Sequence, residues 1–249
     1  MSEWFAYDWE VRGLPARFRV DLQYAEQPDL RERFVTLLFV TAVPRREGAA
    51  AFSFMERGRL EPMLQHCRAL LGEAGVHVGT VSLDAQVRHY FYTSDARLLV
   101  PLYAYCSRER GLRLSCSKAE EPGWETYRQY LCPDAGKRQS AANRAFIADR
   151  LARGDDVATP RRIDLTFRFA TSNRRAAFSA AAVPLGFVAG RASFDEQSDL
   201  PYTLTLHANA PLVHAALTVL TTRAIHAAEQ QQGAFDALDA AFLPKNGPR

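Results

Sequence analysis

Hydrophobic residues recur with two different periods along the chain, and each change of period marks an expected element. The sequence FVTLLFVTAV, residues 34–43, is apolar at both alternating positions, which predicts a central strand covered on both faces. Over residues 60–74 apolar side chains return at every third or fourth position, which predicts a helix that ends at Gly75. Residues 44–58 are expected to form the loop between them.

The rest of the first half continues this alternation of strands and helices. Strands over 76–82 and 87–93 are predicted to form a hairpin, followed by a helix from the N-cap Asp95 to Arg110 and a strand over 112–117. The resulting order β-α-β-β-α-β is that of a ferredoxin-like domain. A hairpin with strands over 4–11 and 16–22 is expected to precede it.

The second half repeats the same order. A helix is predicted over 143–153, ending at Gly154, with an apolar stripe made of Phe146, Ile147, Leu151 and Ala152. A half-buried strand over 163–169 follows, because apolar and polar residues alternate there. The remaining expected elements are a helix capped by Ser172 or Asn173, strands over 187–194 and 202–208, a helix capped by Asn209, and an edge strand over 234–242.

These patterns predict an α+β fold class with two tandem ferredoxin-like domains, the first with an extra N-terminal β-hairpin. The expected boundaries are a first domain over 1–135, a linker helix and turn over 136–160, and a second domain over 161–249. The tail PKNGPR, residues 244–249, is expected to be disordered.

The register of the predicted hairpin decides whether two histidines meet. Pairing Ser82 with Val87 places His77 and His89 on opposite faces of the sheet, because side chains alternate along a strand. A metal ion shared by the two would require a slip of one residue in the register.

Composition places the chain among soluble globular proteins. Its 249 residues are 47% hydrophobic and 24% charged, and the net charge of +3 is too small to argue for nucleic acid as a partner. The beginning lacks the pattern of a secretory signal, and the chain has no run of apolar residues long enough to cross a membrane, so a cytoplasmic protein without membrane contact is expected. The cysteines, at 67, 106, 116 and 132, are expected to be free thiols.

No motif of catalysis is present in the sequence. GxSxG, HExxH, a phosphate-binding loop and a dinucleotide fingerprint are all missing. His66 and Cys67 are neighbours about 100° apart on the predicted helix, so they diverge rather than pair. We therefore expect no enzyme activity, no cofactor and no metal site.

Several residues resemble those of two known families. Gly154-Asp155-Asp156, Pro160-Arg161 and Ile163-Asp164 are similar to the segment that leads into RraB-type domains, the regulators of ribonuclease E activity, and the order of elements over 140–243 is similar throughout. The first half resembles an uncharacterised bacterial domain. Its marks here are Val78-Gly79, Tyr90-Phe91-Tyr92 and Trp124-Glu125-Thr126-Tyr127.

The resemblance implies a non-catalytic protein-binding regulator, because RraB-like proteins bind a ribonuclease E scaffold and restrain RNA decay. Where that family ends in Gly-Gly-x-Tyr-Asp-Gly-Trp, this chain has Gly233, Phe235 and Asp236 but no Trp. Residues 140–249 also lack the acidic character of the family. The expected partner-binding residues are Asp155, Asp156, Arg161, Arg162, Phe235 and Asp236.

Two other functions remain open at this point. Exposed Tyr90 and Tyr92, together with pairs such as Arg161-Arg162 and Arg174-Arg175, would suit an RNA-binding module. Strands that are apolar on both faces would suit a homo-oligomer, because crossover helices cover only one side of a sheet. Residues 120–131 are expected to form an aromatic helix that caps the first domain. The residues expected at the interface between the domains are Tyr90, Tyr92, Trp124 and Tyr127.

Overall fold

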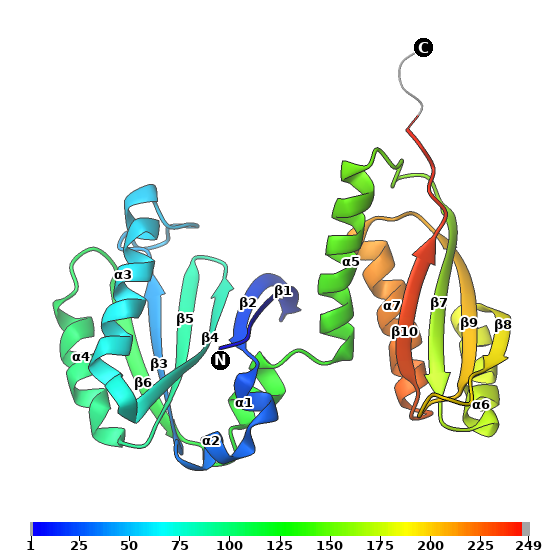
Figure 1. Cartoon of the computed structure of the whole chain (residues 1–249). Helices are drawn as coiled ribbons and strands as arrows, with labels where there is room; N and C mark the ends of the chain where they lie inside the picture. The colour runs from blue at the N-terminus through cyan, green and yellow to red at the C-terminus, as the bar shows by residue number, and fades with distance from the viewer. Residues whose placement is uncertain (1, 246–249) are drawn as a thin grey trace. The chain divides into compact units, whose positions relative to one another are not determined.

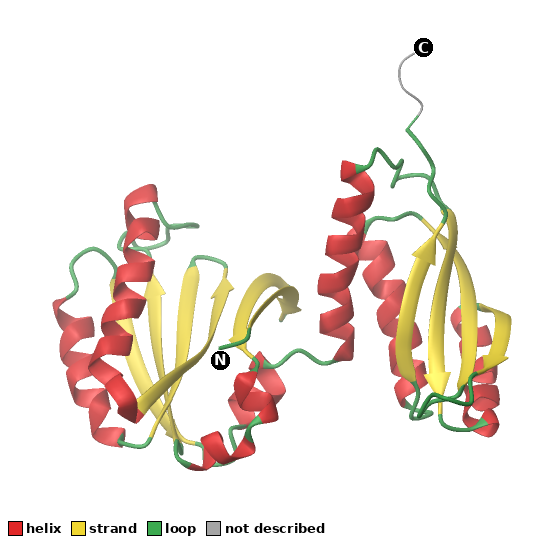
Figure 2. Ribbon diagram, viewed as in Figure 1, coloured by secondary structure: helices red, strands yellow, loops and turns green. Residues whose placement is uncertain are grey.

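The computed structural model describes residues 2–245, apart from the side chain of Leu30. It shows an α+β protein with two separate antiparallel sheets (Figures 1 and 2), as the sequence predicts for the fold class. The chain divides into two compact units, Met1–Pro133 and Asp134–Arg249. Of the tail expected to be disordered, residues 246–249 lie outside the described part, whereas the Lys245 amide donates a hydrogen bond to the Gly154 carbonyl over 2.9 Å.

The first unit is built on a six-stranded sheet in the order β1-β2-β4-β5-β3-β6. Its strands are β1 (Trp4–Val11), β2 (Leu14–Asp21), β3 (Thr36–Val43), β4 (Gly75–Leu83), β5 (Gln86–Thr93) and β6 (Arg113–Glu120). Helices α3 (Phe54–Leu71) and α4 (Leu99–Arg108) pack on one face, where Leu38, Val40 and Phe91 meet Leu64 and Leu102 in a common core (Figure 1). As predicted, β3 is an interior strand, paired with β5 and β6.

Helix α3 begins earlier than its apolar spacing predicts. The Ser53 side chain accepts from the Glu56 amide at 3.3 Å, and the Glu56 carboxylate accepts from the Ser53 amide at 2.7 Å. This reciprocal capping box satisfies two backbone donors of the first turn and starts the helix at Phe54. The prediction of a loop over 44–58 was therefore wrong for its last five residues, because Phe54 and Met55 are exposed and carry no apolar pattern.

The second face of this sheet is covered by segments of the first unit itself. They are a π-helical turn, Thr126–Leu131, and α1 (Gln23–Glu26), whose Tyr24 contacts Trp124 and Tyr127. Helix α2 (Pro28–Glu32) follows α1. Trp124 stacks on Tyr92 with ring centroids 3.8 Å apart and donates from Nε1 to the Phe34 carbonyl at 2.6 Å. The Tyr127 hydroxyl donates to the Asp21 carbonyl at 2.6 Å. These residues form the expected aromatic cap, but the expected helix over 120–131 was wrong in its first half: Glu120 ends β6, and the helical turn is a π-helix that begins at Thr126.

This cap corrects two expectations about the aromatic residues. Tyr90 is 5% exposed, and Tyr92, Trp124 and Tyr127 are fully buried, with partners inside the first unit. They pack as core residues of that unit, and this packing does not require the expected contact with the second domain. The apolar second face needs no second copy of the chain, because residues flanking the β-α-β-β-α-β segment already cover it.

A β-bulge in β4 brings together the two histidines that were expected on opposite faces. Ser82 pairs with Val87 as predicted, but the register shifts between His77 and Gly79. The extra residue turns His77 to the face of His89, and the two rings lie 5.6 Å apart. Thr80 Oγ1 bridges them, at 3.1 Å from His77 Nε2 and 2.8 Å from His89 Nδ1.

The second unit has a four-stranded sheet in the order β10-β7-β9-β8. Its elements follow the chain order β7 (Arg161–Phe169), α6 (Ser172–Ala182), β8 (Val188–Phe194), β9 (Tyr202–Ala210), α7 (His214–Glu229) and β10 (Ala234–Ala240). Helices α6 and α7 lie on one face (Figure 2), over a core that includes Phe167, Phe178 and Leu217. The predicted edge strand at the end of the chain is confirmed as β10.

Helix α5 (Ala135–Ala152) belongs to this unit and packs against α7. It starts at the N-cap Asp134, well before the apolar residues that predicted it. Its buried side is formed by Gly136, Ser140, Asn143 and Ile147, whereas Leu151, expected in the buried stripe, is 45% exposed. Asn143 donates from Nδ2 to Thr221 Oγ1 at 2.9 Å, so the contact between the two helices is partly polar.

The caps of the last two helices also differ from prediction. Thr171, not Ser172 or Asn173, caps α6 by accepting from the Arg174 amide. Asn209 does not cap α7, because it lies in β9 opposite Arg162 and the strand continues to Ala210. The long pairing of β9 with β7 outweighs the local preference of Asn for a helix cap.

The buried indole of Trp124 gives a test of this packing. Its backbone is in the left-handed region, with φ 55°, where a bulky residue is strained, so the buried side-chain contacts have to offset that strain. Trp124→Phe keeps a ring against Tyr92 but leaves the Phe34 carbonyl unpaired. We expect a loss of about 1–3 kcal/mol in the unfolding free energy of the first unit, measured by urea titration with far-UV circular dichroism. Tyr103→Phe, at a side chain that is 65% exposed, is the control and should change the unfolding free energy little. Equal unfolding free energies for the two variants would contradict the stabilising role of the Trp124 indole.

Candidate partner-binding surface

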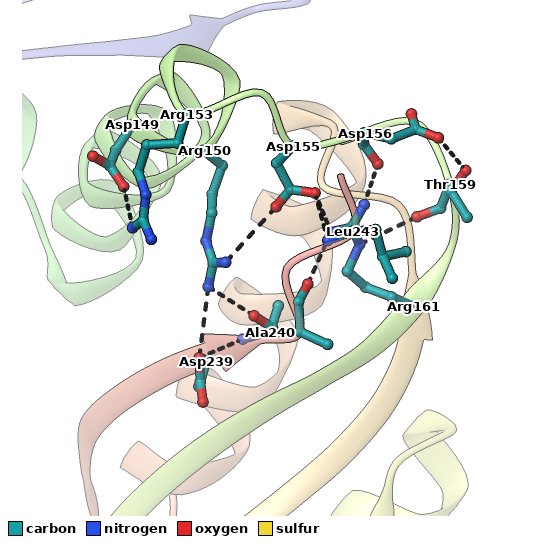
Figure 3. A network of polar contacts seen from close by, with 11 residues as sticks. Asp149, Arg150, Arg153, Asp155, Asp156, Thr159, Arg161, Asp239, Ala240 and Leu243 are labelled. Atoms are coloured by element: carbon teal, nitrogen blue, oxygen red, sulfur yellow. Dashed lines mark hydrogen bonds and ion pairs between the residues drawn. The ribbon is translucent and has the colours of Figure 1, made fainter. Parts of the chain in front are cut away.

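The sequence-predicted residues around Asp155 form one connected network at the end of α5 (Figure 3). Gly154, with φ 82°, takes the left-handed conformation that ends the helix. The chain then turns through Asp155 to Thr159 before β7 begins at Arg161. The residues after β10 return to this turn, where the Leu243 amide donates to Asp155 Oδ1 at 3.0 Å.

Arg161 joins the pieces of this network. Its Nη1 donates to Asp155 Oδ1 at 2.6 Å and to the Ala241 carbonyl at 2.9 Å. Its Nη2 donates to the Asp156 carbonyl, and its Nε to the Thr159 carbonyl at 3.3 Å. The guanidinium therefore ties the turn after α5 to the segment after β10, and its planar fork suits these several acceptors.

A second arginine approaches the same carboxylate. Arg150, on the last turns of α5, has Nη1 3.7 Å from Asp155 Oδ2 and donates from Nη2 to the Ala240 carbonyl at 2.7 Å. Burial of Asp155 opposes its ionisation, but the hydrogen bonds from Arg161 and the Leu243 amide and the two positive charges prevail and hold its pKa below the usual value. The carboxylate is therefore charged at neutral pH.

Asp155 and Arg161 are buried, at 0% and 5% exposure, so the structure places them beneath the surface rather than on it. Asp156 is half-buried, and its side chain accepts from Thr159 Oγ1 at 2.6 Å within the turn. The expectation that these residues contact a partner directly does not suit their positions. They hold the end of α5, the start of β7 and the segment after β10 together.

Arg162, by contrast, begins a row of polar side chains on the face of the sheet opposite α6 and α7. Along β7, Arg162, Asp164, Thr166 and Arg168 alternate with the buried residues Ile163, Leu165, Phe167 and Phe169. Within the described part of the second unit no helix covers this row (Figure 2). We call this side of β10-β7-β9-β8 the open face.

One end of the open face carries a three-residue cluster. Asp164 Oδ1 accepts from Arg162 Nε at 2.7 Å and lies 2.8 Å from His207 Nδ1. His207 Nε2 is 2.9 Å from Arg162 Nη2. A neutral imidazole with its proton on Nδ1 satisfies both contacts, because arginine can only donate. Partial burial disfavours the charge on Asp164, but the bonds from Arg162 and His207 lower its pKa.

The middle and the other end of the open face are also paired. Thr166 and Thr205 face each other with their hydroxyl oxygens 3.1 Å apart. Arg168 donates from Nε to Asp236 at 2.9 Å, and this carboxylate projects from a bulge in β10. Phe235, its neighbour, lies on the covered side against Phe167. Of the expected partner-binding residues, only Arg162 and Asp236 belong to the open face.

Sequence reasoning missed Asp164, Thr205 and His207 as members of this surface. The signal was present, since Asp164 is a polar position of the alternating strand and His207 pairs opposite it in β9. What the sequence does not show is the pairing of β7 with β9, which sets these residues side by side. Gly190 on β8 leaves room for the imidazole, because a Cβ there would meet His207 Nε2 at 1.8 Å.

Comparison with known proteins agrees with this two-part architecture. Residues 2–132 match the model of a family described as "Family of unknown function (DUF695)". The chain belongs to the DUF695 family. Residues 140–239 match the family "Regulator of ribonuclease activity B" (RraB), which confirms the resemblance noted in the sequence.

Other comparisons with this DUF695 chain are less informative. A crystal structure of an unknown protein from Galdieria sulphuraria is 10% identical, covers 83% of this chain and 98% of its own, and has a TM-score of 0.23. A search of curated proteins found no match.

Two side chains of this DUF695 chain that could be reactive, Cys67 and His89, are buried. Among residues 2–245, no three His, Cys, Asp or Glu side chains converge to hold a metal ion. Burial, with a smaller effect of Cys116, raises the pKa of Cys67 to about 12, so its reactive thiolate is disfavoured. Burial and the charge of Arg68 lower the pKa of His89 to about 4. No helix within these residues has the length and apolarity to span a membrane.

Burial bears on two expectations for this DUF695 chain. The RNA-binding alternative required Tyr90 and Tyr92 on an exposed sheet, and both are buried. His66 is exposed and packs on Tyr105, whereas Cys67 is buried, so this pair diverges as predicted.

Asp155→Asn tests the network of Figure 3. The substitution leaves two guanidinium groups near a neutral amide, and breaking such a buried pair costs about 3 kcal/mol or more. The pKa of Asp155 is lowered in the folded state. Its contribution to the unfolding free energy is therefore complete at pH values above its ordinary pKa, and is lost as the pH falls through its folded-state pKa. We therefore expect the difference in unfolding free energy between wild type and variant to be largest near neutral pH and to shrink below about pH 4.

The matched control is Asp149→Asn, in a separate pair near the end of α5 (Figure 3). Asp149 pairs with Arg153 at 3.4 Å, but both side chains are more than 60% exposed. Such a pair contributes about 0–1 kcal/mol. Urea unfolding of the second unit at several pH values separates the two variants, and equal, pH-independent effects would disprove the buried role of Asp155.

Proposed function

We propose that this chain is a non-catalytic, protein-binding regulator of a ribonuclease E-type RNA-decay machinery, and that its partner binds the open face of the second unit. The match of residues 140–239 to the RraB family supports the regulatory role, because that family regulates ribonuclease activity. The DUF695 match over the first unit carries no stated function. The proposal therefore places partner binding in the second unit.

We infer further that both units are ferredoxin-like. In the second, β7-α6-β8-β9-α7-β10 gives the strand order β10-β7-β9-β8. In the first, β3-α3-β4-β5-α4-β6 gives β4-β5-β3-β6, with the β1-β2 hairpin added beside β4. These two orders are equivalent when read in opposite directions.

The observation that carries the choice of surface is the row of polar side chains on the open face. Its charged groups are held by neighbours, as in Arg168–Asp236 and Arg162–Asp164, so their positions are set before a partner arrives. A preordered polar surface loses less side-chain entropy on binding than a flexible one. Charges of both signs on one face would favour a protein segment that itself carries both, and would orient it.

Thr205→Lys tests this surface. Thr205 lies in the middle of the open face, where a lysine side chain can extend without disturbing the core. It would occupy space that the partner requires and add an unpaired charge. We expect binding to purified ribonuclease E, measured by calorimetry, to weaken by roughly tenfold or more, as for loss of a central interface contact.

The control, Ala176→Lys, introduces the same residue at an exposed position of α6, on the covered side of the sheet. It should leave the affinity unchanged. Absence of binding by the folded wild-type chain would exclude ribonuclease E as the target. Binding that both variants preserve would exclude the open face.

A further inference from the structure

The first unit contains a cleft of about 470 Å³ on the face of its sheet that lies opposite α3 and α4. Its apolar wall includes Phe39, Val81, Tyr90 and Tyr130, from β3, β4, β5 and the π-helical turn. The turn after β1 contributes Arg12, and the first residue of β5 contributes Gln86. This volume is in the range of sites for small organic molecules.

The charged groups of the cleft are suited to a negative ligand. Arg88 and Arg12 contribute two guanidinium groups, and Gln86 adds a side-chain amide. None of the described residues lining the cleft is acidic, and neither arginine forms an ion pair with a carboxylate within residues 2–245. A guanidinium without a carboxylate partner beside an apolar wall is a strong donor site for an anion.

Two contacts fix the position of the Arg88 side chain in the cleft. Its guanidinium lies 5.0 Å from the centroid of the Phe39 ring, and its Nε donates to Thr41 Oγ1 at 2.9 Å. The cation therefore rests at the boundary between the apolar wall and the polar mouth. A ligand that places its anionic group against Arg88 can bury its apolar part against Phe39 and Tyr130, the half-buried rings of the wall.

We propose that this cleft binds a small organic anion, with a single carboxylate or similar group on an apolar body. A nucleic-acid strand fits less well, because binding of bases requires exposed aromatic faces. Tyr90 is only 5% exposed, and Arg88 lies against Phe39. All lining residues of the cleft belong to the first unit, so this proposal does not rest on partner binding by the second.

Two fluorescent probes that differ by one charge test the proposal on the full chain. Anilinonaphthalenesulfonate carries an anionic group on an aromatic body, and phenylnaphthylamine has a similar body without the charge. We expect Arg88→Gln to weaken binding of the anionic probe roughly tenfold and that of the neutral probe little, because one charge-assisted contact is lost. Arg12→Gln, at an exposed turn, should also weaken binding of the anionic probe, without affecting folding.

The control is Arg17→Gln, an exposed residue of β2 that does not line the cleft. This substitution should leave the affinity for both probes unchanged. Displacement of the anionic probe by octanoate but not by octanol would support the proposal. The proposal would be overturned if the variants lost affinity for both probes equally, or if Arg88→Gln and Arg12→Gln had no effect. It would also be overturned if single-stranded RNA displaced the anionic probe and octanoate did not.

Discussion

The two helices of a β-α-β-β-α-β unit cover one face of its sheet, so the other face must be either covered by additional residues or polar. This protein shows both outcomes. In the first unit β3 is apolar on both sides, and the segment around Trp124 and Tyr127 covers the second face. In the second unit β7 alternates strictly, and its second face carries Arg162, Asp164, Thr166 and Arg168. The second sheet consequently has a polar face that no helix of its own unit covers, whereas the first has a cleft beside its aromatic cover.

The buried Asp155–Arg161 pair has a different role from the exposed pairs of the open face. A buried pair is costly to desolvate and adds little net stability compared with apolar residues of the same size, but removal of one member leaves an uncompensated charge. Here the pair fixes how the turn after α5 meets the segment after β10, through hydrogen bonds to Ala241 and Leu243. Residues that resemble a family motif can therefore have a structural role.

Much of the fold could be predicted from the sequence, because it follows from local periodicity. The strict alternation of Ile163 to Phe169 and the apolar run of β3 both correspond to the observed strands. The failures come from tertiary contacts. A single inserted residue at the bulge in β4 moved His77 to the face of His89, and pairing with β7 kept Asn209 in a strand. The buried side of α5, with Ser140 and Asn143, could not be recognised as buried without knowing that α7 supplies polar partners.

Three arginines show why burial and partners, more than residue type, decide which positions can bind. Arg161 is buried and donates to one carboxylate and three carbonyl groups, so little of its capacity remains for a ligand. Arg162, the next residue, is exposed but shared between Asp164 and His207, which suits a surface whose charges are already balanced. Arg88 has a hydroxyl and an aromatic ring as neighbours and no carboxylate at ion-pair distance among the described residues. Since an anion gains most from a cation that is positioned but not neutralised, the first unit is where a small anion would bind, and the second is where a protein with mixed charges would bind.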